Sequence, residues 1–128
     1  MILLDSDIMI DLLRQYPPAI RWLNRLDADE PVVLPGYVVM ELTQGCRNRD
    51  EIQQVQRAIS TCAIVWPSPS ECDQALELFI TYRLSHQIGL LDVMIAQTAL
   101  SLDVPLFSFN QKHYQCIPGL KTIQPYEK

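Results

Sequence analysis

The sequence has no long apolar run, and this excludes a protein that spans a membrane with an α-helix. Its apolar runs are short, such as Val93–Ala96, whereas a membrane-spanning helix needs roughly 20 apolar residues. The apolar start Met1–Leu4 is interrupted at once by the charged Asp5, so we expect no signal peptide. We therefore expect a soluble, cytoplasmic protein.

Paired cysteines and an excess of basic residues are also missing. The four cysteines contain no CxxC pair and no metal-ligand spacing, so we expect free, buried thiols in a reducing compartment. The 15 acidic residues outnumber the 10 lysines and arginines, which argues against tight, nonspecific nucleic-acid binding. The net charge of −5 does not exclude a nuclease, because bound metal ions reverse the sign of a site built from carboxylates.

The sequence contains no repeats, linkers or low-complexity tracts, and its 128 residues have the usual size of one domain. We therefore predict a single domain over residues 1–128. Short apolar segments alternate with helical patterns, which indicates an α/β fold with a parallel sheet. The predicted strands are 2–4, 31–34, 63–66, 105–108 and 121–123. The predicted helices are about 7–15, 19–26, 37–46, 50–59, 70–84 and 90–102.

Three helices carry more detailed predictions. The long helix is expected to begin at Ser70 as its N-cap and to turn Leu76 toward the core. The helix 90–102 is apolar nearly all round, so we predict that it is central and buried. For the first helix, either Ser6 or Asp7 is expected to be the N-cap.

Parallel α/β sheets place their sites beyond the carboxyl ends of the strands, where the strand order reverses. Asp5 ends the first predicted strand, and Asn110 lies just after the fourth. If these two strands are neighbours, both residues converge on one crevice.

Asp92 is the most informative acidic residue. On a helix it shares a face with Ile95, Ala96 and Ala99, so it is expected to point inward, where an unpaired carboxylate is costly. Its position near a helix N-terminus offers a purely structural alternative, because the helix dipole favours an acidic residue there.

The other acidic residues are individually ambiguous. Glu41 lies on a mixed helix face and reads equally well as a partly exposed glutamate. Asp5 has a structural alternative to a metal-binding role, because an aspartate after a strand often caps a helix. Asp7 shares a face with Asp11 and Arg14, which indicates a solvated stripe, with a supporting role beside a metal as the alternative.

Taken together, Asp5, Glu41 and Asp92 favour a metal site. Oxygen ligands suit Mg²⁺ and Mn²⁺, and such ions can activate water for phosphodiester hydrolysis. No Ser-His-Asp or Cys-His arrangement competes, because His86 and His113 have no credible nucleophile nearby. We expect His113 in a surface loop, where it either contacts substrate or has no role.

Four motifs, in this order along the chain, resemble those of the PIN-domain family. They are Leu3–Asp11, Val38–Leu42, Ile88–Ala99, and Leu106–Tyr114 followed by Ile117–Leu120. The resemblance covers essentially the whole chain. Within the family, the chain is similar to the small VapC-like type, the toxins of bacterial toxin–antitoxin modules.

This resemblance implies a PIN-like, three-layer fold with a five-stranded parallel sheet flanked by helices. It implies a homodimer, a small antitoxin partner, and Mg²⁺- or Mn²⁺-dependent cleavage of RNA by an activated water, without a covalent enzyme intermediate. Asp5, Glu41 and Asp92 match the family's three principal metal-binding acids.

The chain departs from the family pattern at three positions. Asn110 stands where many members carry Asp, so this position could ligate a cation only through a neutral amide. Ser108 stands where Thr is common and keeps the hydroxyl. Asp7 replaces a neutral polar residue, and we hypothesise that it restores the charge that is lost at Asn110.

Parts of the sequence also resemble three other classes of protein. The Asp5-Ser6-Asp7 segment mimics a haloacid-dehalogenase nucleophile loop, but no lysine precedes Lys112 and no acidic pair follows the fourth strand. A response-regulator receiver needs an aspartate after the third strand, where this chain has Trp66 and Pro67. A PIN fold that binds RNA or protein without catalysis remains the alternative to the enzyme.

Overall fold

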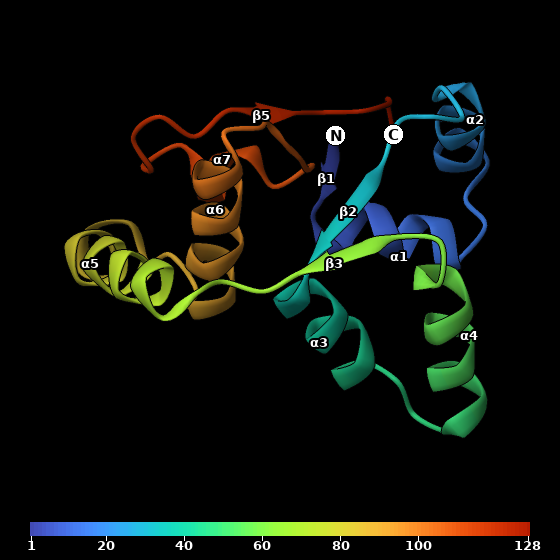
Figure 1. The fold of residues 1–128 in the computed structure, drawn as a ribbon, viewed down its shortest axis with the longest axis horizontal. Helices are drawn as coiled ribbons and strands as arrows, with labels where there is room; N and C mark the ends of the chain where they lie inside the picture. Colours follow the sequence, from blue (N-terminus) through green and yellow to red (C-terminus); the bar gives the residue numbers. More distant parts are fainter.

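Short runs of branched apolar residues form a five-stranded sheet at the centre of this computed structural model, which describes residues 1–128 (Figure 1). The strands are β1 (Ile2–Leu4), β2 (Val32–Pro35), β3 (Ala63–Val65), β4 (Leu106–Phe107) and β5 (Thr122–Ile123). Their order is β3-β2-β1-β4-β5, and every neighbouring pair is parallel. The predicted α/β class and all five predicted strands are confirmed.

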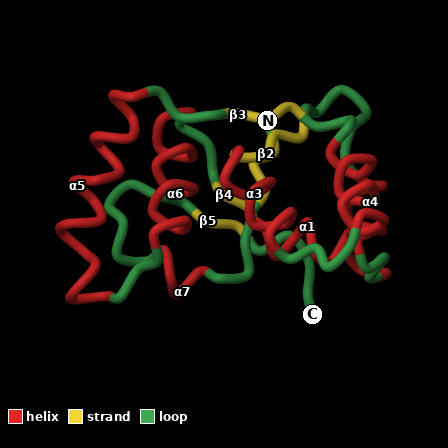
Figure 2. The backbone as a smooth tube through the Cα atoms, turned by 90° about the horizontal axis from the view of Figure 1, so that it is seen from below, coloured by secondary structure: helices red, strands yellow, loops and turns green.

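Helices connect the strands and flank the sheet. They are α1 (Ser6–Leu13), α2 (Pro17–Arg25), α3 (Gly36–Gln44), α4 (Arg49–Ile59), α5 (Pro69–His86), α6 (Leu90–Leu102) and the one-turn α7 (Gln111–Tyr114). Figure 2 shows α5 and α6 to one side of the strands and α4 to the other. None of the helices is long and apolar enough to cross a membrane.

Three helix starts differ from the sequence prediction. Helix α2 begins at Pro17, two residues before the predicted start, because Pro is tolerated at the first helical positions. The N-cap of α1 is Asp5, which the sequence also left open as a cap, rather than Ser6 or Asp7. The Asp5 carboxylate accepts a hydrogen bond from the Ser6 backbone N–H. The N-cap of α5 is Ser68, not Ser70. Ser68 forms a capping box with Glu71, and Pro69 occupies the first helical position, where its missing N–H costs nothing.

The predicted central helix is confirmed. Every residue of α6 from Val93 to Ala99 is buried, including the polar Gln97 and Thr98. The Thr98 hydroxyl donates to the Met94 carbonyl, and the Gln97 amide donates to the Gln74 side chain on α5. Because these polar groups are satisfied internally, α6 can be covered by other elements on all sides.

Three further expectations were wrong. Leu76 is exposed rather than directed inward, because α5 is covered by α6 along one side only (Figure 2). The four free cysteines are half-buried rather than buried. His113 lies in the short helix α7 rather than in a loop.

The pairing of β1 with β4 positions the rest of the site. Leu3 is in register with Leu106, and Leu4 with Phe107. One residue further along, the Asp5 backbone N–H donates to the Phe107 carbonyl over 3.0 Å. The expectation that the first and fourth strands are neighbours is confirmed, and Asp5 lies beside the residues that follow β4.

Candidate active site

Asp5 is at the centre of the site and is only 1% exposed. Its Oδ1 atom accepts the capping hydrogen bond from the Ser6 backbone N–H over 2.7 Å. Its Oδ2 atom accepts from the Ser108 hydroxyl over 2.8 Å and from the Tyr114 hydroxyl over 2.9 Å. The sequence left open that Asp5 only caps a helix. The structure shows that its carboxylate caps α1 and also contacts Ser108, just after β4, and Tyr114 in α7.

Asp92 lies in the first turn of α6 and approaches Asp5 through a shared neighbour. Its Oδ1 atom is 3.4 Å from the Tyr114 hydroxyl, which donates more closely to Asp5. Burial raises the pKa of Asp92, and the nearby charge of Asp5 raises it further. Asp92 thus points inward, as the helix pattern predicts, toward a second carboxylate.

Glu41 reaches the same centre from α3. One of its carboxylate oxygens, Oε1, is buried and has no hydrogen-bond partner. Burial, followed by the charges of Asp5 and Asp92, raises the pKa of Glu41 from 4.5 to about 7. A buried oxygen without a donor is costly, so Glu41 is better suited to a ligand than to a structural contact.

Asp7 connects α1 to the segment after β4. Its two carboxylate oxygens accept from the backbone N–H groups of Ile8 and Phe109, each over 2.8 Å. Burial and the charge of Asp5 raise its pKa to about 6. The predicted solvated stripe is wrong, because Asp7 is half-buried and Asp11 is buried, where it accepts a hydrogen bond from Tyr126.

Asn110 and His113 lie at the edge of this cluster. The Asn110 backbone N–H donates to the Ser108 hydroxyl, but the Asn110 side chain is exposed and makes no hydrogen bond within the chain. The His113 ring is largely exposed, and its Nδ1 atom lies 3.8 Å from an Asp92 oxygen. Both side chains are therefore free to contact a ligand of the site.

The cluster contains no lysine or arginine that neutralises it: no salt bridge joins such a side chain to Asp5, Glu41 or Asp92. Carboxylate oxygens without a cation suit a hard divalent ion, and the unpartnered Glu41 oxygen fits that interpretation. No three acidic or histidine side chains are already placed to hold one ion together. This spacing still suits Mg²⁺, which takes one or two protein carboxylates and keeps several waters.

Sequence reasoning assigned no role to Tyr114 and treated Ser108 only as a substitute for threonine. Both donate to the same oxygen of Asp5. Ser108 could have been found from its place at the end of β4. Tyr114 gave no such signal, because its direction depends on the single turn of α7, which the sequence did not predict.

Sequence comparison decides the family. A sequence model of the PIN domain matches residues 2–116 of this chain. The chain belongs to the PIN-domain family. Two related proteins of Mycobacterium tuberculosis are each 32% identical to it: Ribonuclease VapC10 over 122 residues, and Ribonuclease VapC19 over 123 residues. These alignments cover 94% and 93% of this chain, and 91% and 96% of the two relatives.

Solved structures agree with this PIN fold. A toxin–antitoxin complex from Klebsiella pneumoniae contains a chain that superposes with a TM-score of 0.78 at 26% identity, covering 100% of both chains. VapBC-1 from nontypeable Haemophilus influenzae gives a TM-score of 0.78 at 27% identity, covering 98% of each. The expected PIN-like fold is confirmed.

The strained state of Glu41 gives a prediction about stability. A carboxyl whose pKa is raised on folding opposes folding wherever it is ionised, so stability falls as pH rises from about 4.5 through about 7. In chelator at pH 8, Glu41→Gln should raise the free energy of unfolding by roughly 1–2 kcal/mol, allowing for solvent screening. At pH 4 it should have little effect.

Thermal and urea melts at both pH values measure this difference, with Glu77→Gln on the exposed face of α5 as the matched control. A pH-independent loss of roughly 3–5 kcal/mol in the Glu41 variant would instead mean that Glu41 is held by a buried cation.

Proposed function

We propose that this PIN domain is a Mg²⁺- or Mn²⁺-dependent endoribonuclease, the toxin of a toxin–antitoxin pair, which acts in the cytoplasm. The observation that carries the proposal is the convergence of Asp5, Glu41 and Asp92 with no lysine or arginine among them. The relatives named ribonucleases, which align over nearly the whole chain, support the choice of RNA as substrate.

The chain's own residues divide the work of such a site. Asp5, Glu41 and Asp92 would hold the cation, one or two of them directly and the rest through its water ligands. The cation would supply Lewis-acid chemistry, activating a water as the nucleophile and offsetting charge on the scissile phosphate. Ser108 and Tyr114 fix the orientation of Asp5. His113, at the exposed rim, is placed to contact the RNA backbone near Asp92.

A PIN fold that only binds RNA or protein is the second candidate, and Asn110 favours it. Asn110 is exposed and offers a neutral amide where many family members have a carboxylate, so it brings no charge to a cation. The site therefore attracts a cation less strongly than a site with a fourth acid would. Cleavage of structured RNAs with and without Mn²⁺ separates the two functions.

The exposed face of α5 supports the further proposal of a homodimer. Leu76, Ile80 and Leu84 recur every four residues, so they form one stripe along the helix. All three are exposed, Leu84 to 93%. An uncovered apolar stripe of this kind is typical of a protein–protein interface, and a second copy of the chain offers the same stripe in return.

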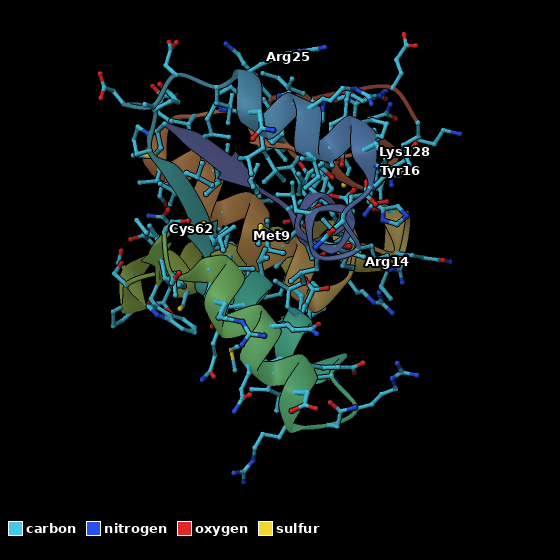
Figure 3. All side chains as sticks on the ribbon, turned by 90° about the vertical axis from the view of Figure 1, so that its right-hand side faces the viewer. Met9, Arg14, Tyr16, Arg25, Cys62 and Lys128 are labelled. Atoms are coloured by element: carbon cyan, nitrogen blue, oxygen red, sulfur yellow. The ribbon has the colours of Figure 1, made fainter.

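An antitoxin segment has a groove to occupy. A cavity of about 700 Å³ lies between α1, α2, α4 and β2, and most of the residues that line it are apolar. In Figure 3, Met9 and Cys62 on its wall lie between α2 above and α4 below. Leu13 and Gln54 also line a second, neighbouring cavity, whose wall includes Glu41.

The first functional prediction concerns catalysis. Asp5→Asn and Asp92→Asn should each abolish RNA cleavage, because each removes a charge that holds the cation, while the protein stays folded. Cleavage is measured on structured RNA in Mn²⁺, and folding by circular dichroism. Near wild-type cleavage by Asp92→Asn would place the active site elsewhere.

The second concerns Asn110. If its amide only lacks a charge that a cation would use, Asn110→Asp should lower the Mg²⁺ concentration needed for half-maximal cleavage. A titration of cleavage rate against Mg²⁺ tests this expectation. An unchanged or higher requirement would mean that the amide makes a specific contact or lies outside the site.

The third concerns the partner. We expect an antitoxin lysine or arginine to approach Asp5, Glu41 and Asp92, since the site is acidic and lacks a cation of its own. Mg²⁺ should then weaken antitoxin binding, measured by calorimetry across a Mg²⁺ series with Na⁺ at matched ionic strength as the control. An antitoxin bound on the far face, with nuclease activity intact, would contradict this arrangement.

A further inference from the structure

Tyr114 is the least expected member of the site. It ends α7, which packs against α6 (Figure 1), and its side chain is only 1% exposed. Its hydroxyl oxygen lies 2.9 Å from Oδ2 of Asp5 and 3.4 Å from Oδ1 of Asp92. A single uncharged side chain therefore reaches two of the three carboxylates.

We propose that Tyr114 is a positioning residue whose hydroxyl fixes the Asp5 carboxylate beside Asp92 and so strengthens the binding of a divalent cation. This inference rests on the proposed function, since it concerns the metal that the nuclease would use. It assigns the residue no direct contact with the metal or the RNA.

The hydrogen bonds around Asp5 show which acceptor positions of its carboxylate are occupied and which is left for a cation. An ionised carboxylate offers about four acceptor positions, two on each oxygen. On Oδ2 both positions are used, by the hydroxyls of Ser108 and Tyr114. On Oδ1 one position is used by the Ser6 N–H, which leaves one position for a cation. Donors on both oxygens prevent the carboxylate from rotating. The Asp5 side chain therefore loses little conformational entropy when a cation binds.

An uncharged donor suits this position better than a charged one. A tyrosine phenol, with a pKa of about 10 in water, keeps its proton at neutral pH and can donate it to Asp5. A lysine or arginine here would neutralise the acids and compete with a metal ion. A phenol orients Asp5 and leaves the negative charge of the site in place.

Tyr114 is also part of the hydrophobic core, so its ring and its hydroxyl need separate tests. Tyr114→Phe keeps the ring and removes only the hydroxyl. Tyr126→Phe is a matched control, because the Tyr126 hydroxyl donates to an oxygen of Asp11, a carboxylate outside the acidic site, over 2.6 Å. Each variant loses one tyrosine–aspartate hydrogen bond, and only the first loses it from the proposed metal site.

The experiment measures Mn²⁺ affinity by titration calorimetry and the rise in Tm that Mn²⁺ produces, for the full-length wild type and both variants. Tyr114→Phe should bind Mn²⁺ about tenfold more weakly, as is typical when the hydrogen-bond partner of a metal ligand is removed. Tyr126→Phe should bind Mn²⁺ as the wild type does, because the Tyr126 hydroxyl contacts Asp11 and no proposed metal ligand. Cleavage by Tyr114→Phe should be slow at low Mn²⁺ and recover when Mn²⁺ is raised.

Ser108→Ala removes the other donor to the same oxygen, so it tests the idea again if Tyr114→Phe folds poorly. Ser108 is fully buried but is not part of the hydrophobic core, and the variant also removes the acceptor of the Asn110 N–H. It too should weaken Mn²⁺ binding. Unchanged affinity in both site variants would overturn the proposal, and tighter binding by Tyr114→Phe would show that the hydroxyl competes with the metal. If the wild type itself bound no Mn²⁺, the proposed function would fail, and this inference with it.

Discussion

The site depends on the parallel pairing of β1 with β4. These strands are not neighbours in sequence, and more than 100 residues separate Asp5 from Ser108 and Tyr114. The pairing also marks the point where strand order reverses, because β2 lies on one side of β1 and β4 on the other. A register shift between β1 and β4 would move the Asp5 carboxylate away from both hydroxyls at once.

A second constraint follows, because the carboxylates of the site repel one another. The fold meets it with neutral donors: backbone N–H groups for Asp5 and Asp7, and two hydroxyls for Asp5. Glu41 receives no such donor on Oε1. The repulsion among the carboxylates is therefore only partly offset within the chain. A bound cation would stabilise the Glu41 carboxylate most, because its Oε1 atom has no donor.

Much of the fold, and the meeting of Asp5, Glu41 and Asp92 at one place, could be predicted from sequence, whereas their role as metal ligands stays a prediction. Periodicity found five strands and six helices, since each follows a clear apolar pattern, and the inward direction of Asp92 followed from its helical neighbours. The remaining features could not be predicted, because several neighbouring residues fit the same local role. Asp5, Ser6 and Asp7 can all cap a helix, and the sequence does not show that Asp5 keeps an extended backbone whose N–H donates to the Phe107 carbonyl. Leu76 fits an inward stripe, yet no element of the chain covers that side of α5.

Asp7 shows most clearly how one position can serve both structure and charge. The hypothesis that it restores the charge lost at Asn110 requires its carboxylate to be ionised, whereas burial and Asp5 raise its pKa to about 6. Both of its oxygens already accept backbone hydrogen bonds, one of them from Phe109, next to Asn110. Asp7 therefore acts first on geometry, by holding the segment that carries Ser108 and Asn110 against α1. Its charge reaches the site only above about pH 6, and a cation bound at Asp5 would lower that threshold, because it stabilises the ionised form of every carboxyl near it.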